Sequence, residues 1–246
     1  MTISPLEDLT RWYLDDEAEM GEGRVQTAII RLLLSCLRDL AEERGWSDYV
    51  IDSDQYIAWM ESDPNVRVAP DVYLLWHPPE DPWVESWQTW RPDHPTPVFA
   101  LEVVSYDWHK DYVLAPEKYG SLGVDELIVF DPKPHTRPRG RGTPFQLYRR
   151  TAQGVLQRQP ADRGAWSATF GVFFVAVETE ERVRVRLATS VDPLVLLPTP
   201  AERSKEEAER SKEEAERSKE DTEETRRENE RLMALLRQHG IDPTTD

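Results

Sequence analysis

The chain of 246 residues is long enough for one ordinary domain and an additional segment. Its 47 acidic and 30 basic residues give a formal net charge of −17, which disfavours nonspecific binding to polyanions because phosphate contacts depend on Lys and Arg. The single Cys36 excludes an intramolecular disulfide, and the absence of an 18-residue apolar run and of a basic N-terminal signal leads us to expect a soluble cytoplasmic protein without a membrane span.

The first predicted element is an amphipathic helix over residues 24–44. Apolar residues recur there at three- and four-residue spacing, and Gly45 is a natural stop. Cys36 lies within this stripe, so we expect it in the core. The stripe consists of Val25, Ala28, Ile29, Leu32, Leu33, Cys36, Leu37 and Leu40.

Short β-branched and aromatic runs bounded by turn residues follow and predict strands. A short helix is predicted near 116–122, with Pro116 in its first turn and Gly123 at its end. Helices mixed with strands indicate an α/β or α+β domain. Residues 77–96 hold five prolines and three tryptophans, so we expect a long loop whose tryptophans cover the body. The predicted strands lie within 50–60, 66–76, 97–105, 126–132, 144–150, 169–177 and 182–188.

Residues 199–246 form a tail in which AERSKEE occurs at 201–207 and 208–214. They hold 15 of the acids and 10 of the bases, which leaves 32 acids and 20 bases, a net charge of −12, in residues 1–198. Glu–Arg pairs four residues apart favour a helix. The heptad seam consists of Ala, Ser and Thr until Asn229, Leu232 and Leu236, so both a solvated single helix and a weak coiled coil fit the pattern.

Two carboxylates interrupt apolar predicted strands. Asp71 follows Pro70 in VRVAPDVYLLW, and Glu102 lies inside PVFALEVVS. Acids on neighbouring strands can meet at one edge of a sheet, and two carboxylates suit Mg²⁺, which keeps several waters. Lys110 and Lys118 follow as candidate cations that could orient a metal-bound water. Alternatively, Asp71 makes a turn and Glu102 pairs with an arginine.

The segments APDVYLL, FALEVVS and KDY…PEKYGSLGVDELIVFDP resemble the Uma-two family of endonucleases, in the PD-(D/E)xK restriction-nuclease superfamily. The resemblance covers roughly residues 20–190 and is most specific from Glu102 to Pro132. The charged heptad tail is also similar to tails on many members. We interpret Tyr119 and Val124 as packing residues, Gly123 as a helix stop, and Asp131 with Pro132 as the exit turn of a strand.

The resemblance implies a restriction-endonuclease-like α/β core, a mixed central sheet flanked by helices, over residues 1–198. It implies an endonuclease in which Asp71 and Glu102 hold Mg²⁺ or Mn²⁺ and hydrolyse nucleic acid, DNA in the first place. The lysine positions that are usual in the superfamily or in many relatives correspond to Val104 and Ala115, so Lys118 or Lys110 would have to substitute. An additional site residue from the first helix would be Glu22 or Gln26.

Two other functions stay open at this point. A catalytically silent scaffold could bind partners, or a second copy of the chain, through the tail at 199–246. A non-cleaving nucleic-acid-binding module could use the basic stretch 133–150, which otherwise forms a solvated loop.

Overall fold

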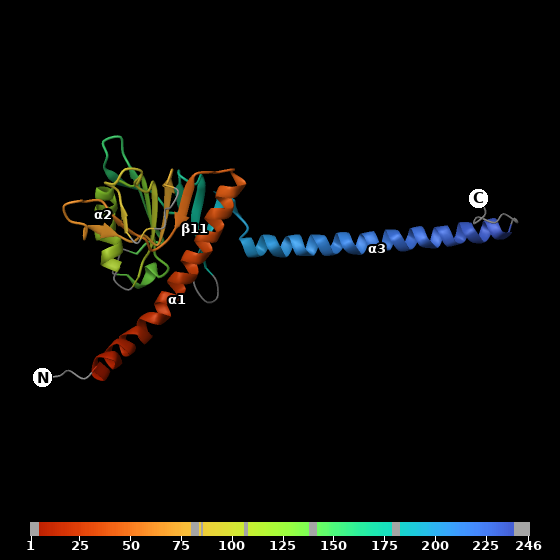
Figure 1. The fold of residues 1–246 in the computed structure, drawn as a ribbon, viewed down its shortest axis with the longest axis horizontal. Coiled ribbons are helices and arrows are strands. Elements are labelled where there is room, and N and C mark those ends of the chain that lie inside the picture. The colour runs from red at the N-terminus through yellow and green to blue at the C-terminus, as the bar shows by residue number, and fades with distance from the viewer. Residues whose placement is uncertain are drawn as a thin grey trace. The chain divides into compact units, whose positions relative to one another are not determined.

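The computed structural model describes residues 5–79, 84, 86–105, 108–137, 142–178 and 183–238, with the backbone alone for 5–22 and 24. The chain divides into two compact units, Met1–Leu197 and Pro198–Asp246 (Figure 1). The first contains all three sheets, and the second contains a single long helix. None of the described helices is long and apolar enough to cross a membrane.

The central sheet of the first unit has six strands in the order β1-β4-β6-β7-β8-β9. β6 and β7 run parallel, and every other neighbouring pair is antiparallel. The predicted mixed sheet is therefore confirmed. Its strands are β1 (Tyr49–Asp52), β4 (Val72–Trp76), β6 (Phe99–Val103), β7 (Glu126–Phe130), β8 (Phe145–Arg150) and β9 (Leu156–Gln159).

Two smaller sheets accompany the central one. The antiparallel sheet β10-β11-β12-β13 comprises β10 (Ala165–Ser167), β11 (Val172–Glu178), β12 (Val183–Val191) and β13 (Leu194–Leu196). The sheet β3-β2-β5 comprises β3 (Arg67–Val68), β2 (Tyr56–Ala58) and β5 (Ser86–Gln88).

β5 corrects the expectation that residues 77–96 form only a loop. It pairs in parallel with β2, and its Trp87 side chain is fully buried. The indole N–H of Trp87 donates to the Pro95 carbonyl at 2.9 Å, so the one polar atom of this ring is satisfied inside the core. Burial of Trp87 agrees with the expectation that tryptophans of this segment cover the body.

Helix α1 (Pro5–Glu43) begins well before the predicted start at residue 24 and ends where predicted. Gly45 has a left-handed φ of 66°, and its N–H donates to the Glu42 carbonyl at 2.9 Å. Such a left-handed residue after the last turn is a common helix stop, for which glycine is favoured. Leu33 and Leu37 are fully buried on the core-facing side, and Cys36 lies beside them as expected.

The alternation of side chains along the central strands builds two hydrophobic layers, one on each face of the sheet. Leu74, Phe99 and Ile128 face α1 and the four-stranded sheet. Leu75, Ala100 and Val129 face the opposite side, where α2 (Ala115–Leu122) and the three-stranded sheet pack. In Figure 1, α1 and α2 accordingly lie on opposite sides of the strands.

The connection from β6 to β7 supplies α2. It begins with a π-helical turn, η1 (Lys110–Leu114), continues directly into α2, and ends at Gly123 with a φ of 106°. The short predicted helix and its glycine stop are thereby confirmed. A 3₁₀ turn, η2 (Pro134–Thr136), follows β7. Both η1 and η2 begin just beyond the C-terminal ends of the parallel strands β6 and β7, where ligands of α/β sheets commonly bind.

The second unit is helix α3 (Pro200–Gln238). Thr199 and Glu202 form a capping box, in which the Glu202 N–H donates to Thr199 Oγ1 at 3.2 Å and the Thr199 N–H donates to Glu202 Oε2 at 2.8 Å. Exposed ion pairs one turn apart, such as Lys205–Glu209 at 3.8 Å, follow along the helix. The predicted helix is confirmed.

Candidate active site

Asp71 lies at the start of β4, directly after Pro70, and is buried. Its Oδ2 accepts the backbone N–H of Val103 at 2.7 Å. The side-chain amide of Gln26, on α1, donates to Oδ1 at 3.0 Å and to Oδ2 at 3.1 Å. Of the two first-helix candidates, Gln26 therefore reaches Asp71, while the side chain of Glu22 lies outside the described residues. Asp71 thus connects α1, β4 and β6.

Glu102 lies on β6, next to β4. In the antiparallel register Val72 faces Leu101, and one further step places Asp71 opposite Glu102. Directly opposite residues have their side chains on the same face, with Cβ atoms about 4.5–5.5 Å apart. The two predicted acids are therefore brought together. The Tyr119 hydroxyl, on α2, donates to Glu102 Oε1 at 2.5 Å, and both side chains are buried.

Burial and like charges make both carboxylates hard to ionise. Burial raises the pKa of Asp71 to about 6, although the hydrogen bonds from Val103 and Gln26 act in the other direction. Burial also raises the pKa of Glu102 well above its ordinary value, and the nearby charge of Asp71 raises it further. A site of this kind favours either protons or a cation on its oxygens.

Asp111, in η1, is a third acid beside the pair. Its Oδ2 accepts the backbone N–H of Ser105 at 3.0 Å, and its negative charge raises the pKa values of both Asp71 and Glu102. The Lys110 ammonium lies 3.7 Å from Asp111 Oδ1. Its positive charge lowers the pKa of Glu102, so Lys110 acts electrostatically on this member of the acid pair. Lys118 is exposed on α2.

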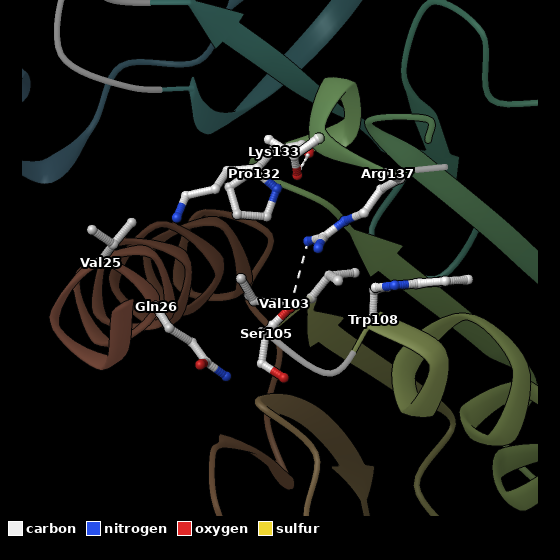
Figure 2. Close-up of a pocket in the computed structure, with 10 residues that line it drawn as sticks. Val25, Gln26, Val103, Ser105, Trp108, Pro132, Lys133 and Arg137 are labelled. Atoms are coloured by element: carbon white, nitrogen blue, oxygen red, sulfur yellow. Dashed lines mark hydrogen bonds between the residues drawn. The ribbon is translucent and has the colours of Figure 1, made fainter. Parts of the chain in front are cut away.

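A pocket of about 620 Å³ opens at this edge of the sheet (Figure 2). Gln26 and Val103, which both bind Asp71, form part of its wall, so Asp71 lies behind this part of the lining. Trp108 stands across the pocket from the α1 residues, and Lys133 and Arg137 approach from the segment after β7 (Figure 2). The lining residues are Val25, Gln26, Val103, Val104, Ser105, Trp108, Pro132, Lys133, Thr136 and Arg137.

Asp131 directly follows β7, as expected for an exit turn, and it is also the centre of a buried hydrogen-bond network. It is fully buried, and Arg137 donates to both of its oxygens, at 2.7 and 3.0 Å. The Tyr112 hydroxyl donates to Oδ2 at 2.7 Å, and the Lys133 N–H donates to Oδ1 at 2.8 Å. Lys133 and Arg137, in the basic stretch 133–150, are therefore anchored on Asp131, and the stretch ends in β8, so its described residues do not form only a solvated loop.

The residues present fit a small divalent cation better than a larger protein-built metal centre. Within the described ranges, no three His, Cys, Asp or Glu side chains gather closely enough to hold an ion. Mg²⁺ commonly takes only one or two carboxylates and keeps several waters, which the Asp71–Glu102 pair can satisfy. The mutual repulsion of these buried oxygens is what a cation would relieve.

Sequence reasoning missed the polar contacts of Tyr119 and Asp131, and the place of Arg137 and Lys133 in the pocket. The sequence predicts Tyr119 as a packing residue, and its ring is indeed in the core. The sequence does not reveal which group its hydroxyl contacts. The signal for Asp131 was available: a carboxylate at the end of an apolar strand, six residues before an arginine in a turn-rich segment, suggests an ion pair.

The chain matches a protein-family model over most of its length. The family model described as "Uma2: Putative restriction endonuclease" matches residues 7–174, which include Asp71, Glu102, Lys110, Lys118 and every residue that lines the pocket. A comparison with curated proteins finds no match to the chain.

Proposed function

We propose that this chain, which belongs to the Uma2 family of restriction endonucleases and has their restriction-endonuclease-like fold, is a metal-dependent endonuclease. It hydrolyses nucleic-acid phosphodiester bonds, with DNA as the first substrate to test. The observation that carries the proposal is the pair of buried carboxylates, Asp71 and Glu102, placed opposite one another on neighbouring strands beside a pocket.

In this proposal Asp71 and Glu102 hold Mg²⁺ or Mn²⁺. The ion, when bound, lowers the pKa of an attacking water and offsets charge on the scissile phosphate. Hydrogen bonds within the chain hold both carboxylates in place before a metal binds. Val103 and Gln26 fix the Asp71 carboxylate, and the Tyr119 hydroxyl fixes one oxygen of Glu102, which leaves the other for the cation. Donors held in this way need little reorganisation on binding.

Lys110 is the better candidate for the assisting lysine. Its positive charge acts on Glu102, and its ammonium lies 3.7 Å from Asp111, the acid next to the pair. Lys118 follows further along the chain and is exposed on α2. We therefore assign the electrostatic stabilisation of the reacting phosphate to Lys110 and none to Lys118.

The test uses the full chain with plasmid and single-stranded DNA. Wild-type protein should cleave in Mg²⁺ or Mn²⁺ and stop when EDTA removes the metal. Lys110→Ala should lower the rate about tenfold or more, because a charge near the reacting phosphate is lost. Gel analysis of nicked and linear products over time measures each rate.

Lys118→Ala is the matched control, since it removes the same charge from an exposed position on the adjoining helix. Its rate should equal that of the wild type. Equal losses in the two variants would contradict the assignment to Lys110, and cleavage that persists in EDTA would contradict a metal-dependent reaction.

A second candidate function, partner binding through the tail, is favoured by a separate observation. Near its C-terminal end α3 exposes an apolar cluster, with Leu232 48%, Met233 42%, Leu235 44% and Leu236 37% exposed. Leu232 and Leu236 continue the heptad seam that includes Asn229, and a single Asn at such a position can fix the register of a coiled coil. We propose weak self-association through these last turns.

We expect the sedimentation coefficient of the full chain to rise with protein concentration. Truncation after residue 198 should leave a species whose sedimentation does not depend on concentration. Leu232→Glu should have the same effect, because it places a charge in the proposed apolar seam. Ala208→Glu, upstream on the same helix, is the control and should leave association unchanged. A concentration-independent full chain would exclude self-association through the tail.

A further inference from the structure

We infer that the pocket beside the acid pair receives a single unpaired nucleotide, so that the substrate is a single-stranded or locally unpaired segment of nucleic acid. This inference rests on the proposed function, because it names the substrate of the same site. Three features of the described residues support it: the size of the pocket, the aromatic side chain in its wall, and the small number of cations that reach it.

The pocket volume suits one nucleotide. At about 620 Å³ it lies in the range of about 300–1,000 Å³ that is usual for small-molecule sites. Its walls are formed by α1 on one side and, on the other, by Trp108, which precedes η1, and the segment after β7. The end of β6 with Val104 and Ser105 lies between them. A base can enter such a pocket only from a single strand or after it has been taken out of the duplex, as it is by enzymes that do chemistry on bases.

Trp108 gives the pocket an aromatic surface. Its indole lines the side opposite Val25 and Gln26 (Figure 2). It is kept there by an edge-on contact with the Tyr112 ring, with 5.8 Å between ring centroids. Tyr112 is in turn fixed by its hydrogen bond to the buried Asp131. Proteins that bind single strands stack bases on such held aromatic rings, with little sequence preference.

Lys133 and Arg137 provide the positive charge next to this ring. The Arg137 side chain is 10% exposed, and its guanidinium is held by both oxygens of Asp131. Lys133 is anchored through its backbone N–H on the same carboxylate, and its side chain extends toward α1 (Figure 2). Asp131 offsets much of the Arg137 charge, so Lys133 is the main cation for a phosphate of a strand whose base lies against Trp108, and Arg137 adds at most a second contact.

The net charge of the first unit also favours a single strand over a duplex as the ligand. A protein that follows the phosphates of a duplex needs a row of Lys and Arg, whereas residues 1–198 carry a net charge of −12. With only one or two phosphates neutralised at the pocket, the salt dependence of binding should be shallow. For a single strand the slope of log K against log salt should be about −0.7 to −1.4.

The test measures binding in EDTA, so that it does not depend on cleavage. Fluorescence anisotropy with the full chain compares a labelled 12-nucleotide oligothymidylate with a 12-base-pair duplex. The single strand should bind at least about tenfold tighter, and Trp108→Ala should weaken its binding about tenfold, as expected for one lost stacking contact. Trp108→Phe keeps an aromatic ring and should retain most of the affinity. Lys133→Gln should make the salt slope shallower by about 0.7.

Trp166→Ala is the matched control, because Trp166 is an exposed tryptophan on β10 that does not line the pocket. It should bind like the wild type, and the melting temperature of each variant checks that it is folded. A duplex bound as tightly as the single strand, or a Trp108→Ala variant with unchanged affinity, would overturn the inference.

The two proposals fail in different ways. Binding that prefers single strands and depends on Trp108, in a protein that cleaves nothing in Mg²⁺ or Mn²⁺, would sustain the nucleotide pocket and refute the nuclease. Metal-dependent cleavage of intact duplex that Trp108→Ala leaves unchanged would sustain the nuclease and refute the pocket.

Discussion

Glu102→Gln and Asp71→Asn should each lower Mg²⁺-dependent cleavage by at least about 10³-fold, which corresponds to about 4 kcal/mol of lost transition-state stabilisation. The reason is the geometry of the pair. The two carboxylates come from neighbouring strands and face each other, so removing either charge leaves the metal with one protein carboxylate in place of two. Cleavage rates with saturating metal and substrate measure the effect.

The same two variants should fold at least as well as the wild type without metal. Each removes a buried charge but keeps the shape of the side chain. In Glu102→Gln the Tyr119 hydroxyl, which donates to Glu102 Oε1 in the wild type, can donate to the amide oxygen of the substituted side chain. Melting temperatures in EDTA check this. A large loss of stability would mean that the acids are structural, in which case lost cleavage could not be assigned to catalysis.

Glu117→Gln supplies the matched control for the Glu102 variant. Glu117 is exposed in the first turn of α2, two residues before Tyr119. Because this substitution removes the same charge from the same region without touching the acid pair, cleavage should stay within about twofold of the wild type, since exposed substitutions have small effects. Wild-type cleavage rates in Glu102→Gln would refute the proposed site.

The fold was largely predictable from pattern. β-Branched runs such as 97–105 and 126–132 became β6 and β7, and the helix after Pro116 ended at Gly123 as expected. The error over 77–96 has a physical reason. A three-residue strand can be stabilised by one neighbour and one fully buried tryptophan, here Trp87, even where prolines crowd the flanks.

The candidate site was predictable only in part. Acids that interrupt apolar strands pointed to Asp71 and Glu102, because burial of a charge requires compensation. Their pairing depends on the β4–β6 register, which the sequence does not reveal. The partners Gln26, Tyr119 and Arg137 come from α1, α2 and the segment after β7, and only the tertiary fold brings them to the same edge.

Val104 and Ala115, the two positions at which the resemblance implies a lysine, lie in apolar surroundings. Val104 and Ala115 are both buried in the same hydrophobic layer, together with Tyr112 and Tyr119. A lysine at either position would have to extend from this apolar packing toward the acids. The chain instead keeps cations beside the acid pair and around the pocket, at Lys110, Lys133 and Arg137.

Acidification should stabilise the metal-free protein relative to Asp71→Asn. In the unfolded chain Asp71 titrates near its ordinary pKa of 3.8, whereas burial raises its pKa to about 6 in the folded protein. Between these values the folded state binds the proton more tightly, so the free energy of unfolding rises as the pH falls through 6 toward 4. The shift corresponds to at most about 3 kcal/mol.

Asp71→Asn cannot make this change, and it also removes a charge that raises the pKa of Glu102, so the comparison with the wild type reports the coupled titration of the acid pair. Glu126, whose pKa is also raised by burial, contributes with the same sign in both proteins and cancels. In EDTA at pH 7.5 the variant should melt above the wild type, by up to roughly 6–12 °C at about 2–4 °C per kcal/mol, and the two curves should converge near pH 4. Identical pH profiles would show that Asp71 is not a strained buried acid.

Metal should reverse this order, because a cation and a proton compete for the same oxygens. Binding of Mg²⁺ or Mn²⁺ should raise the melting temperature of the wild type most above pH 7 and progressively less toward pH 5, with a much smaller rise in Asp71→Asn, which keeps only one carboxylate for the metal. Calorimetric titration in two buffers of different ionisation enthalpy should reveal protons released on binding, since burial and the charge of Asp71 raise the pKa of Glu102. Binding without proton release would place the metal away from these two acids.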